Sequence, residues 1–210
     1  MLAVSFLLYG LLFGGIIFDL VMPNYSWVLL GVISSFYVIS CLDFYHRSLV
    51  RLNSKLLTWY RFFVYIFSGF TSVYLVREMD QGLYFIAWLF LTIWATDIMA
   101  YYGGKRFGSR QLSVFSPKKT IEGTVIGLLG SVLLVSLFWL QYGFSVYYIL
   151  MTPLVSLLGQ WGDLYESLIK RTYNIKDSSN ALPGHGGFLD RADSTLYVFP
   201  LVYLLLEFLT

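Results

Sequence analysis

Residues 121–141 read IEGTVIGLLGSVLLVSLFWLQ and contain one charged side chain, that of Glu122. An α-helix rises 1.5 Å per residue, so about twenty apolar residues are enough to cross roughly 30 Å of hydrocarbon. The stretch has this length and composition. We therefore expect residues 121–141 to form a helix that spans a membrane.

Similar apolar stretches recur along the whole chain. Of the 210 residues, 58% are hydrophobic, 20% aromatic and only 12% charged, about half of the charged fraction that is usual in a soluble domain. The sequence predicts an all-α, polytopic integral membrane protein that forms one structural domain. Its seven spans are expected at about 2–22, 26–42, 56–76, 82–103, 121–141, 146–161 and 194–209.

The first of these stretches, residues 2–22, could be mistaken for a secretory signal peptide. It has no basic residue before its apolar part and no small-residue cleavage pattern after it, so we interpret it as a span. The sixth stretch is short and runs into Gly159, Gly162 and Asp163, which predicts a helix that changes character part-way across.

The basic residues predict the orientation. Alternate gaps between the spans place 12 of the 14 Lys and Arg residues on one side, the exceptions being Arg61 within a span and Arg77. Short loops rich in Lys and Arg remain in the cytoplasm. The N-terminus is therefore expected in the cytoplasm and the C-terminus outside.

Half of the acidic residues fall at the same cytoplasmic level. Carboxylates near a membrane are costly and usually mark a functional site, although each one could instead sit beside a Lys or Arg in the headgroup region. Asp43 and Asp177 are interpreted as ordinary loop residues. The six carboxylates at the cytoplasmic level are Asp97, Glu122, Asp163, Glu166, Asp190 and Asp193.

The most polar segment, residues 162–193, reads GDLYESLIKRTYNIKDSSNALPGHGGFLDRAD. If its first part is helical, Asp163, Glu166 and Lys170 lie along one stripe, because they are spaced at i, i+3 and i+7. Asp190 and Asp193 form a second acidic pair. Such hard oxygen ligands suit Mg²⁺, which commonly uses one or two carboxylates together with waters and substrate phosphates.

Cations and glycines separate the two acidic pairs. Lys, Arg and His side chains can hold phosphate oxygens, and the backbone N–H groups of the glycine-rich residues 183–187 can approach an anion closely. This combination favours a metal-assisted reaction at a nucleotide phosphate. The cations are Lys170, Arg171, Lys176, His185 and Arg191.

A second polar segment, residues 97–123, reads DIMAYYGGKRFGSRQLSVFSPKKTIEG. Its five cations and its glycines Gly103, Gly104 and Gly108 are typical of phosphate binding, but also of a basic cytoplasmic loop with glycine turns. Neither a GxGxxG nor a Walker pattern is present in the sequence. His46 and His185 stand in different loops and offer no zinc ligand set.

At these residues the chain resembles the phosphatidate cytidylyltransferases, also called CDP-diacylglycerol synthases. Their signature runs S-x-x-K-R, four residues, K-D, five residues, P-x-H-G-G, two residues, D-R-x-D, and every fixed position is present here. Ala192 stands where a larger apolar residue or Thr is usual, which removes no functional group. The matching residues are Ser167, Lys170, Arg171, Lys176, Asp177, Pro183, His185, Gly186, Gly187, Asp190, Arg191 and Asp193.

The resemblance extends over the chain from about residue 80 to the end. Residues 1–80 match only as generic membrane spans, whereas residues 81–210 contain both polar segments and are expected to form the catalytic region. Because the chain is short for the family, we expect it to lack N-terminal spans. Directly before the signature, the family's G-D-L-x-E-S segment is matched by Gly162, Asp163, Leu164 and Glu166. The family's second, looser motif is matched by Asp97, Gly104, Phe107, Gly108, Ser116, Pro117, Lys118, Lys119, Thr120, Glu122 and Gly123.

The resemblance implies the reaction: phosphatidic acid attacks CTP, which gives CDP-diacylglycerol and pyrophosphate at the cytoplasmic face of a bacterial-type inner membrane. It also implies Mg²⁺, with a second, monovalent cation such as K⁺ compatible with the site, and a homodimer without a nucleic-acid partner. Asp163, Asp190, Lys170 and Arg171 would be catalytic. Metal would be held mainly by Asp163 and Asp190, supported by Glu166, Asp193 and Asp97. Substrate binding would fall to Lys118, Lys119, Lys176, His185, Gly186, Gly187 and Arg191.

Three alternatives compete with this hypothesis. A CTP-dependent enzyme could act on another membrane lipid, as a polyprenol kinase or an ether-lipid cytidylyltransferase does, but the intact residues 183–193 favour the phosphatidate enzyme. A transporter would place charges at mid-membrane depth in several spans, whereas only Arg61 is deep here. A non-catalytic relative would not be expected to retain Asp163 and Asp190.

Overall fold

The computed structural model describes residues 25–45, 55–141, 146–179 and 187–209. Within these ranges the chain is all-helical, with no β-strand and a single isolated bridge between Gln111 and Thr120. The predicted all-α class is confirmed for this part of the chain. The helices are α2 (Tyr25–Tyr45), α3 (Lys55–Glu78), α4 (Gly82–Phe107), α5 (Ile121–Gln141), α6 (Val146–Thr172) and α7 (Leu189–Leu209).

Two of these helices, α4 and α5, are long and apolar enough to cross a membrane. Helix α5 covers residues 121–141, as its apolar composition predicts, and the predicted first span at residues 2–22 lies outside the described residues. The sixth predicted span, at about 146–161, corresponds to the first part of α6. Helix α6 continues to Thr172, because the residues that follow Gly162 are mostly good helix formers and pack against α7.

Helices α4 and α5 lie side by side and approach each other closely at small residues. A Cβ added at Gly123 would lie 2.7 Å from the Ala100 carbonyl oxygen, and one added at Gly127 would lie 2.8 Å from that of Thr96. Gly103 faces Ile126 from the other helix in the same way. Small residues at a helix interface let two backbones pack tightly, so Gly103 serves helix packing rather than phosphate binding.

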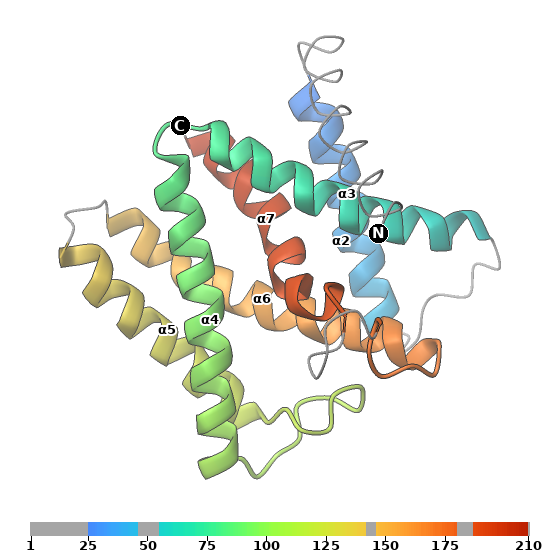
Figure 1. Ribbon diagram of the computed structural model, residues 1–210, viewed down its shortest axis with the longest axis vertical. Coiled ribbons are helices and arrows are strands. Elements are labelled where there is room, and N and C mark those ends of the chain that lie inside the picture. The colour runs from blue at the N-terminus through green and yellow to red at the C-terminus, as the bar shows by residue number, and fades with distance from the viewer. Residues whose placement is uncertain (1–24, 46–54, 142–145, 180–186, 210) are drawn as a thin grey trace.

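Helix α7 packs between α3 and α6 (Figure 1). Its apolar side chains Val198, Phe199 and Val202 are buried in a core that also contains Trp88 and Leu89 of α4. At the lower end of the view in Figure 1, α4 and α5 converge and the loop of residues 108–120 joins them. This arrangement places that loop, the second half of α6 and the start of α7 around one end of the bundle.

A buried ion pair fastens α2 to α3. The Arg61 side chain donates from Nε and Nη2 to the two carboxylate oxygens of Asp43, at 2.9 and 2.7 Å, and the two side chains are 4% and 0% exposed. The Tyr165 hydroxyl of α6 also donates to Asp43, at 3.2 Å. Asp43 is therefore not the ordinary loop residue that the sequence suggested, because its partner lies on the next helix.

Candidate active site

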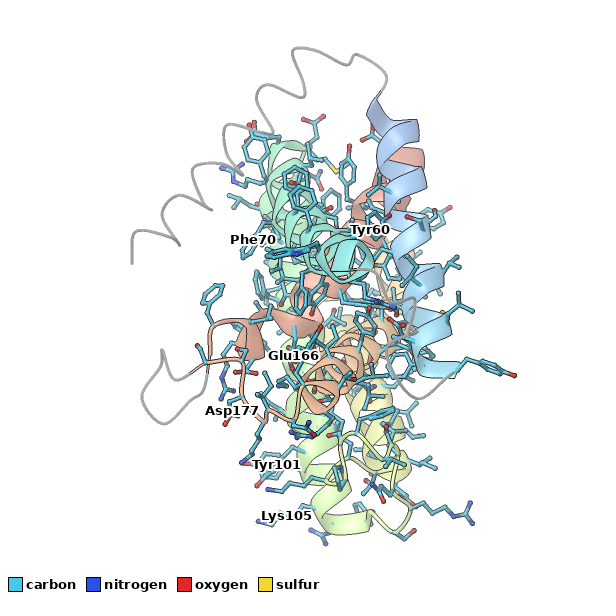
Figure 2. All side chains as sticks on the ribbon, turned by 90° about the vertical axis from the view of Figure 1, so that its right-hand side faces the viewer. Tyr60, Phe70, Tyr101, Lys105, Glu166 and Asp177 are labelled. Carbon is cyan, nitrogen blue, oxygen red and sulfur yellow. The ribbon has the colours of Figure 1, made fainter. Side chains whose placement is uncertain are left out.

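A cavity of about 400 Å³ opens between α4, α5, α6 and the loop of residues 108–120. In Figure 2, Tyr101 and Lys105 lie at the end of α4 that carries this cavity, below Glu166. The lining combines acidic, basic and hydroxyl groups with two glycines. It consists of Asp97, Ala100, Tyr101, Gly104, Lys105, Ser116, Lys118, Lys119, Thr120, Gly123, Thr124, Gln160 and Asp163.

A tight turn presents Lys118 and Lys119 to this cavity. The Lys119 N–H donates to the Ser116 carbonyl at 3.1 Å, and Pro117 occupies the second position of the turn, where its fixed φ is favourable. The Lys119 carbonyl in turn accepts from the Leu112 N–H at 2.8 Å. The backbone of the turn is therefore held from both sides.

Glu122 anchors the beginning of the same loop. Its carboxylate accepts from the backbone N–H of Ser109 at 3.0 Å, from the Ser109 hydroxyl at 2.6 Å and from the Arg110 N–H at 3.2 Å. Because Glu122 is in the first turn of α5, these bonds tie the loop to the helix that follows it. Glu122 thus organises the loop and is not among the residues that line the cavity.

An ion pair between Lys119 and Asp163 joins the two polar segments of the sequence. Both side chains are about one quarter exposed, at 27% and 28%, and both line the cavity. Asp97 lines the same cavity and interacts electrostatically with both of them. Two of the five predicted metal ligands, Asp97 and Asp163, therefore face one space together with a predicted phosphate-binding lysine.

A second cluster forms where α6 meets the start of α7. The Lys170 ammonium pairs with Glu166 one turn earlier on α6 and donates to Asp190 of α7 at 2.7 Å. Asp190 also accepts from the Ser178 N–H and hydroxyl, each at 2.9 Å, and from the Gly187 N–H at 2.7 Å. Burial alone would raise the pKa of Asp190, but these donors, led by Lys170, hold it below its usual value.

The acidic side chains that lie between the sixth and seventh predicted spans affect one another's ionisation. Burial raises the pKa of Glu166 to about 7, although Lys170 opposes the shift and Asp190 adds to it. Burial also raises the pKa of Asp193 well above its usual value, and the charges of Asp163, Glu166 and Asp97 add to the effect. Like charges close together disfavour ionisation, so these acidic residues form one electrostatic group.

Gly162 brings α6 and α7 into contact at this group. A Cβ added there would lie 2.5 Å from the Tyr197 Cβ and 3.3 Å from the Asp193 carbonyl oxygen. From α3, the Tyr65 hydroxyl donates to the same Asp193 carbonyl at 2.8 Å. The first turn of α7 is thus positioned beside Asp163 by close helix packing and by a hydrogen bond from a third helix.

The side chains fit a hard divalent cation held by few protein ligands. Within the ranges that the structure describes, no three Asp, Glu, His or Cys side chains form a group that could hold a metal ion. Mg²⁺ needs only one or two carboxylates when waters and phosphates complete its octahedron. Asp97 and Asp163 meet that requirement in the cavity, and a cation there would offset the mutual repulsion of the acidic group.

The other predicted site residues lie farther out. Arg171 is exposed, and its Nη1 donates to the Ile175 carbonyl at 2.8 Å. Lys176 and Arg191 are also exposed at this end of the molecule. Gly187 is described and uses its N–H for Asp190. The predicted binding residues His185 and Gly186 lie outside the described residues.

Sequence reasoning missed some residues of the site. Gln160 lines the cavity and donates from Nε2 to the Thr124 carbonyl at 3.4 Å. Its place three residues before Asp163 on a helix was a signal that could have found it. Ser178, which donates twice to Asp190, gives no such signal, because its contact depends on how the chain turns after α6.

The sequence of this chain is similar to those of known proteins. A model described as the cytidylyltransferase family matches residues 1–209. The chain belongs to this family. The family assignment agrees with the resemblance seen in the polar segment of residues 162–193.

Bacterial proteins are among the curated relatives of this cytidylyltransferase-family chain. It is 45% identical over 148 residues to the phosphatidate cytidylyltransferase of Bacillus subtilis, an alignment that covers 68% of this chain and 55% of that protein. The phosphatidate cytidylyltransferases of Staphylococcus haemolyticus and Staphylococcus aureus are 43% and 44% identical over 146 residues, with the same coverage. The chain thus spans about half the length of the curated relatives it matches.

Proposed function

We propose that this protein is a CTP:phosphatidate cytidylyltransferase, which makes CDP-diacylglycerol and pyrophosphate for phospholipid biosynthesis. The observation that carries the proposal is the cavity in which Lys118 and Lys119 meet Asp97 and Asp163. Cations and carboxylates in one space suit a nucleotide triphosphate with its metal ion. The names of the curated relatives supply the substrate class.

In this reaction a phosphate oxygen of phosphatidic acid forms a bond to the α-phosphorus of CTP. The bond between that phosphorus and the oxygen bridging to the β-phosphorus breaks, and pyrophosphate leaves with the electron pair. The nucleophile is already an anion at neutral pH, so no general base is required. Lys118 and Lys119 would stabilise negative charge on the leaving group, and the more exposed Arg171, Lys176 and Arg191 would hold the lipid phosphate.

The predicted dependence on Mg²⁺ fits this cavity. A bound Mg²⁺ neutralises and orients phosphate oxygens. Asp163 and Asp97 are the carboxylates that line the cavity, and Asp193 interacts electrostatically with both of them and with Glu166. Asp190, the other predicted principal ligand, would have to exchange its bond from Lys170 for the cation.

We place the site at the cytoplasmic surface of a bacterial-type inner membrane. Lipid tails must stay in the bilayer while CTP arrives from water, so a site at the end of the helix bundle suits both substrates. The two candidate membrane helices, α4 and α5, meet at that end. The distribution of basic residues supports seven spans and a cytoplasmic N-terminus. A homodimer, which the family resemblance implies, completes the proposed arrangement.

The test is pyrophosphate release by purified protein in detergent with CTP, phosphatidic acid and Mg²⁺. Asp163→Asn and Asp190→Asn should each abolish turnover and leave the protein folded. Asp80→Asn is the matched control, because Asp80 is exposed on the connection between α3 and α4, outside both polar segments, and it should retain activity. Near-normal activity of Asp163→Asn would overturn the metal assignment. The substrate assignment would be overturned by formation of CDP with a polyprenol, or by pyrophosphate release with an ether lipid, if phosphatidic acid gave no pyrophosphate.

A further inference from the structure

Lys119 occupies the place at Asp163 where the proposed metal would bind. Its ammonium group pairs with the Asp163 carboxylate inside the cavity and also interacts with Asp97. An ammonium group is a compact, strongly hydrated point charge, and a hard divalent cation prefers the same carboxylate oxygens. Lys119 and such a cation therefore compete for one ligand.

We propose that Lys119 is a displaceable counter-ion, which neutralises Asp163 until a divalent cation takes that carboxylate and then turns its freed ammonium to the nucleotide phosphates. The identity of the nucleotide rests on the proposed function. The exchange of Lys119 for a cation at Asp163 does not depend on it. It makes Lys119 the link between cation binding and nucleotide binding.

The surroundings of Lys119 allow its side chain to move while its backbone stays fixed. The Ser116 carbonyl accepts from its N–H, and its own carbonyl accepts from Leu112, so the turn is held. The side chain is 27% exposed toward the cavity and ends in a flexible four-carbon stem. Only its side-chain torsions need to change for the ammonium to leave Asp163.

Lys170 provides the contrast within the same site. It is 14% exposed and bridges two carboxylates, those of Glu166 and Asp190, which come from different helices. Both partners raise its pKa, although burial opposes them. The Lys170 ammonium is thus held from two sides and largely buried, whereas Lys119 has one ion-pair partner among the described residues and open space beside it.

The exchange predicts how cation affinity depends on Lys119. Lys119→Gln removes the competitor, whereas Lys118→Gln removes an equal charge from the next residue of the same turn, which forms no ion pair within the described part of the chain. Mn²⁺ binding to the purified protein, followed by electron paramagnetic resonance without nucleotide or lipid, separates the two effects. Because a partly exposed ion pair is worth up to about 1 kcal/mol, Lys119→Gln should bind Mn²⁺ about two- to fivefold more tightly than Lys118→Gln.

Equal Mn²⁺ affinity of the two variants, or absence of Mn²⁺ binding by all forms of the protein, would overturn the proposal. The comparison does not depend on turnover, so it can succeed even if pyrophosphate release fails and the proposed function is wrong. Lys118→Gln serves only as the control for cation binding, since Lys118 is itself a predicted nucleotide ligand.

Chemical labelling gives a second test, whose deciding measurement uses only the wild-type protein. Acetylation of Lys119 by a small anhydride, quantified by mass spectrometry, should increase when Mg²⁺ alone is added, because the ammonium leaves Asp163. It should fall when CTP is then added. In Asp163→Asn the labelling should be high and insensitive to Mg²⁺. Labelling of wild-type Lys119 that does not change with Mg²⁺ would contradict the exchange.

Discussion

The buried pair of Arg61 and Asp43 gives the sharpest prediction for the fold. Arg61→Met removes a guanidinium that donates twice to Asp43, and both side chains are almost fully buried. The carboxylate is then left without its principal partner in a medium that solvates charge poorly. Breaking a buried pair in this way costs about 3–5 kcal/mol, which lowers the unfolding midpoint by on the order of 10 °C in a chain of this size.

Thermal unfolding in a mild detergent, followed by tryptophan fluorescence, measures this loss. Arg77→Met is the matched control, because Arg77 is exposed in the last turn of the same helix, and its effect should stay within about 0.5 kcal/mol. Adding Asp43→Asn to Arg61→Met removes the stranded charge and keeps an acceptor for Tyr165, so the double variant should regain much of the lost stability. The reasoning is refuted if Arg61→Met unfolds at the same temperature as Arg77→Met, or if the double variant is no more stable than Arg61→Met.

Two further predictions concern the junction of α6 with α7. Gly162→Ala should reduce turnover sharply and lower stability, because its Cβ would meet the Tyr197 Cβ at 2.5 Å. Gly159→Ala, whose nearest contact would be 3.7 Å away, should be tolerated in both assays. Equal effects of the two substitutions would contradict the packing argument. Glu166 has a pKa of about 7, raised mainly by burial from the ordinary value of 4.5, so its contribution to stability is complete below pH 4.5 and is lost as the pH rises through 7. As the pH rises from 4.5 to 8, the unfolding midpoint of the wild type should therefore fall relative to that of Glu166→Gln. A difference between the two midpoints that stays constant over this pH range would be inconsistent with the raised pKa.

The sequence-based prediction of the site was accurate about the kinds of residue and incomplete about their partners. Asp163, Glu166 and Lys170 share one helix, as their spacing predicts, and Glu166 pairs with Lys170 one turn later. Spacing along a helix determines such neighbours because the helical repeat is constant. The same spacing does not predict the ion pair between Asp163 and Lys119, which lie on different segments. It also does not predict the hydrogen bonds from Ser178 to Asp190, because they depend on how the chain turns after α6.

The sequence by itself determined the helical class, the apolar length of α5, the polar composition of both segments and the family, since these follow from local composition and fixed spacing. Only the tertiary structure decided that Asp43 meets Arg61, that Gly103 packs against α5, and that Lys119 reaches Asp163. The physical reason is that contacts between helices depend on how closely and at what points their backbones cross. Those crossings are set by small residues on two helices at once, which no single stretch of sequence specifies.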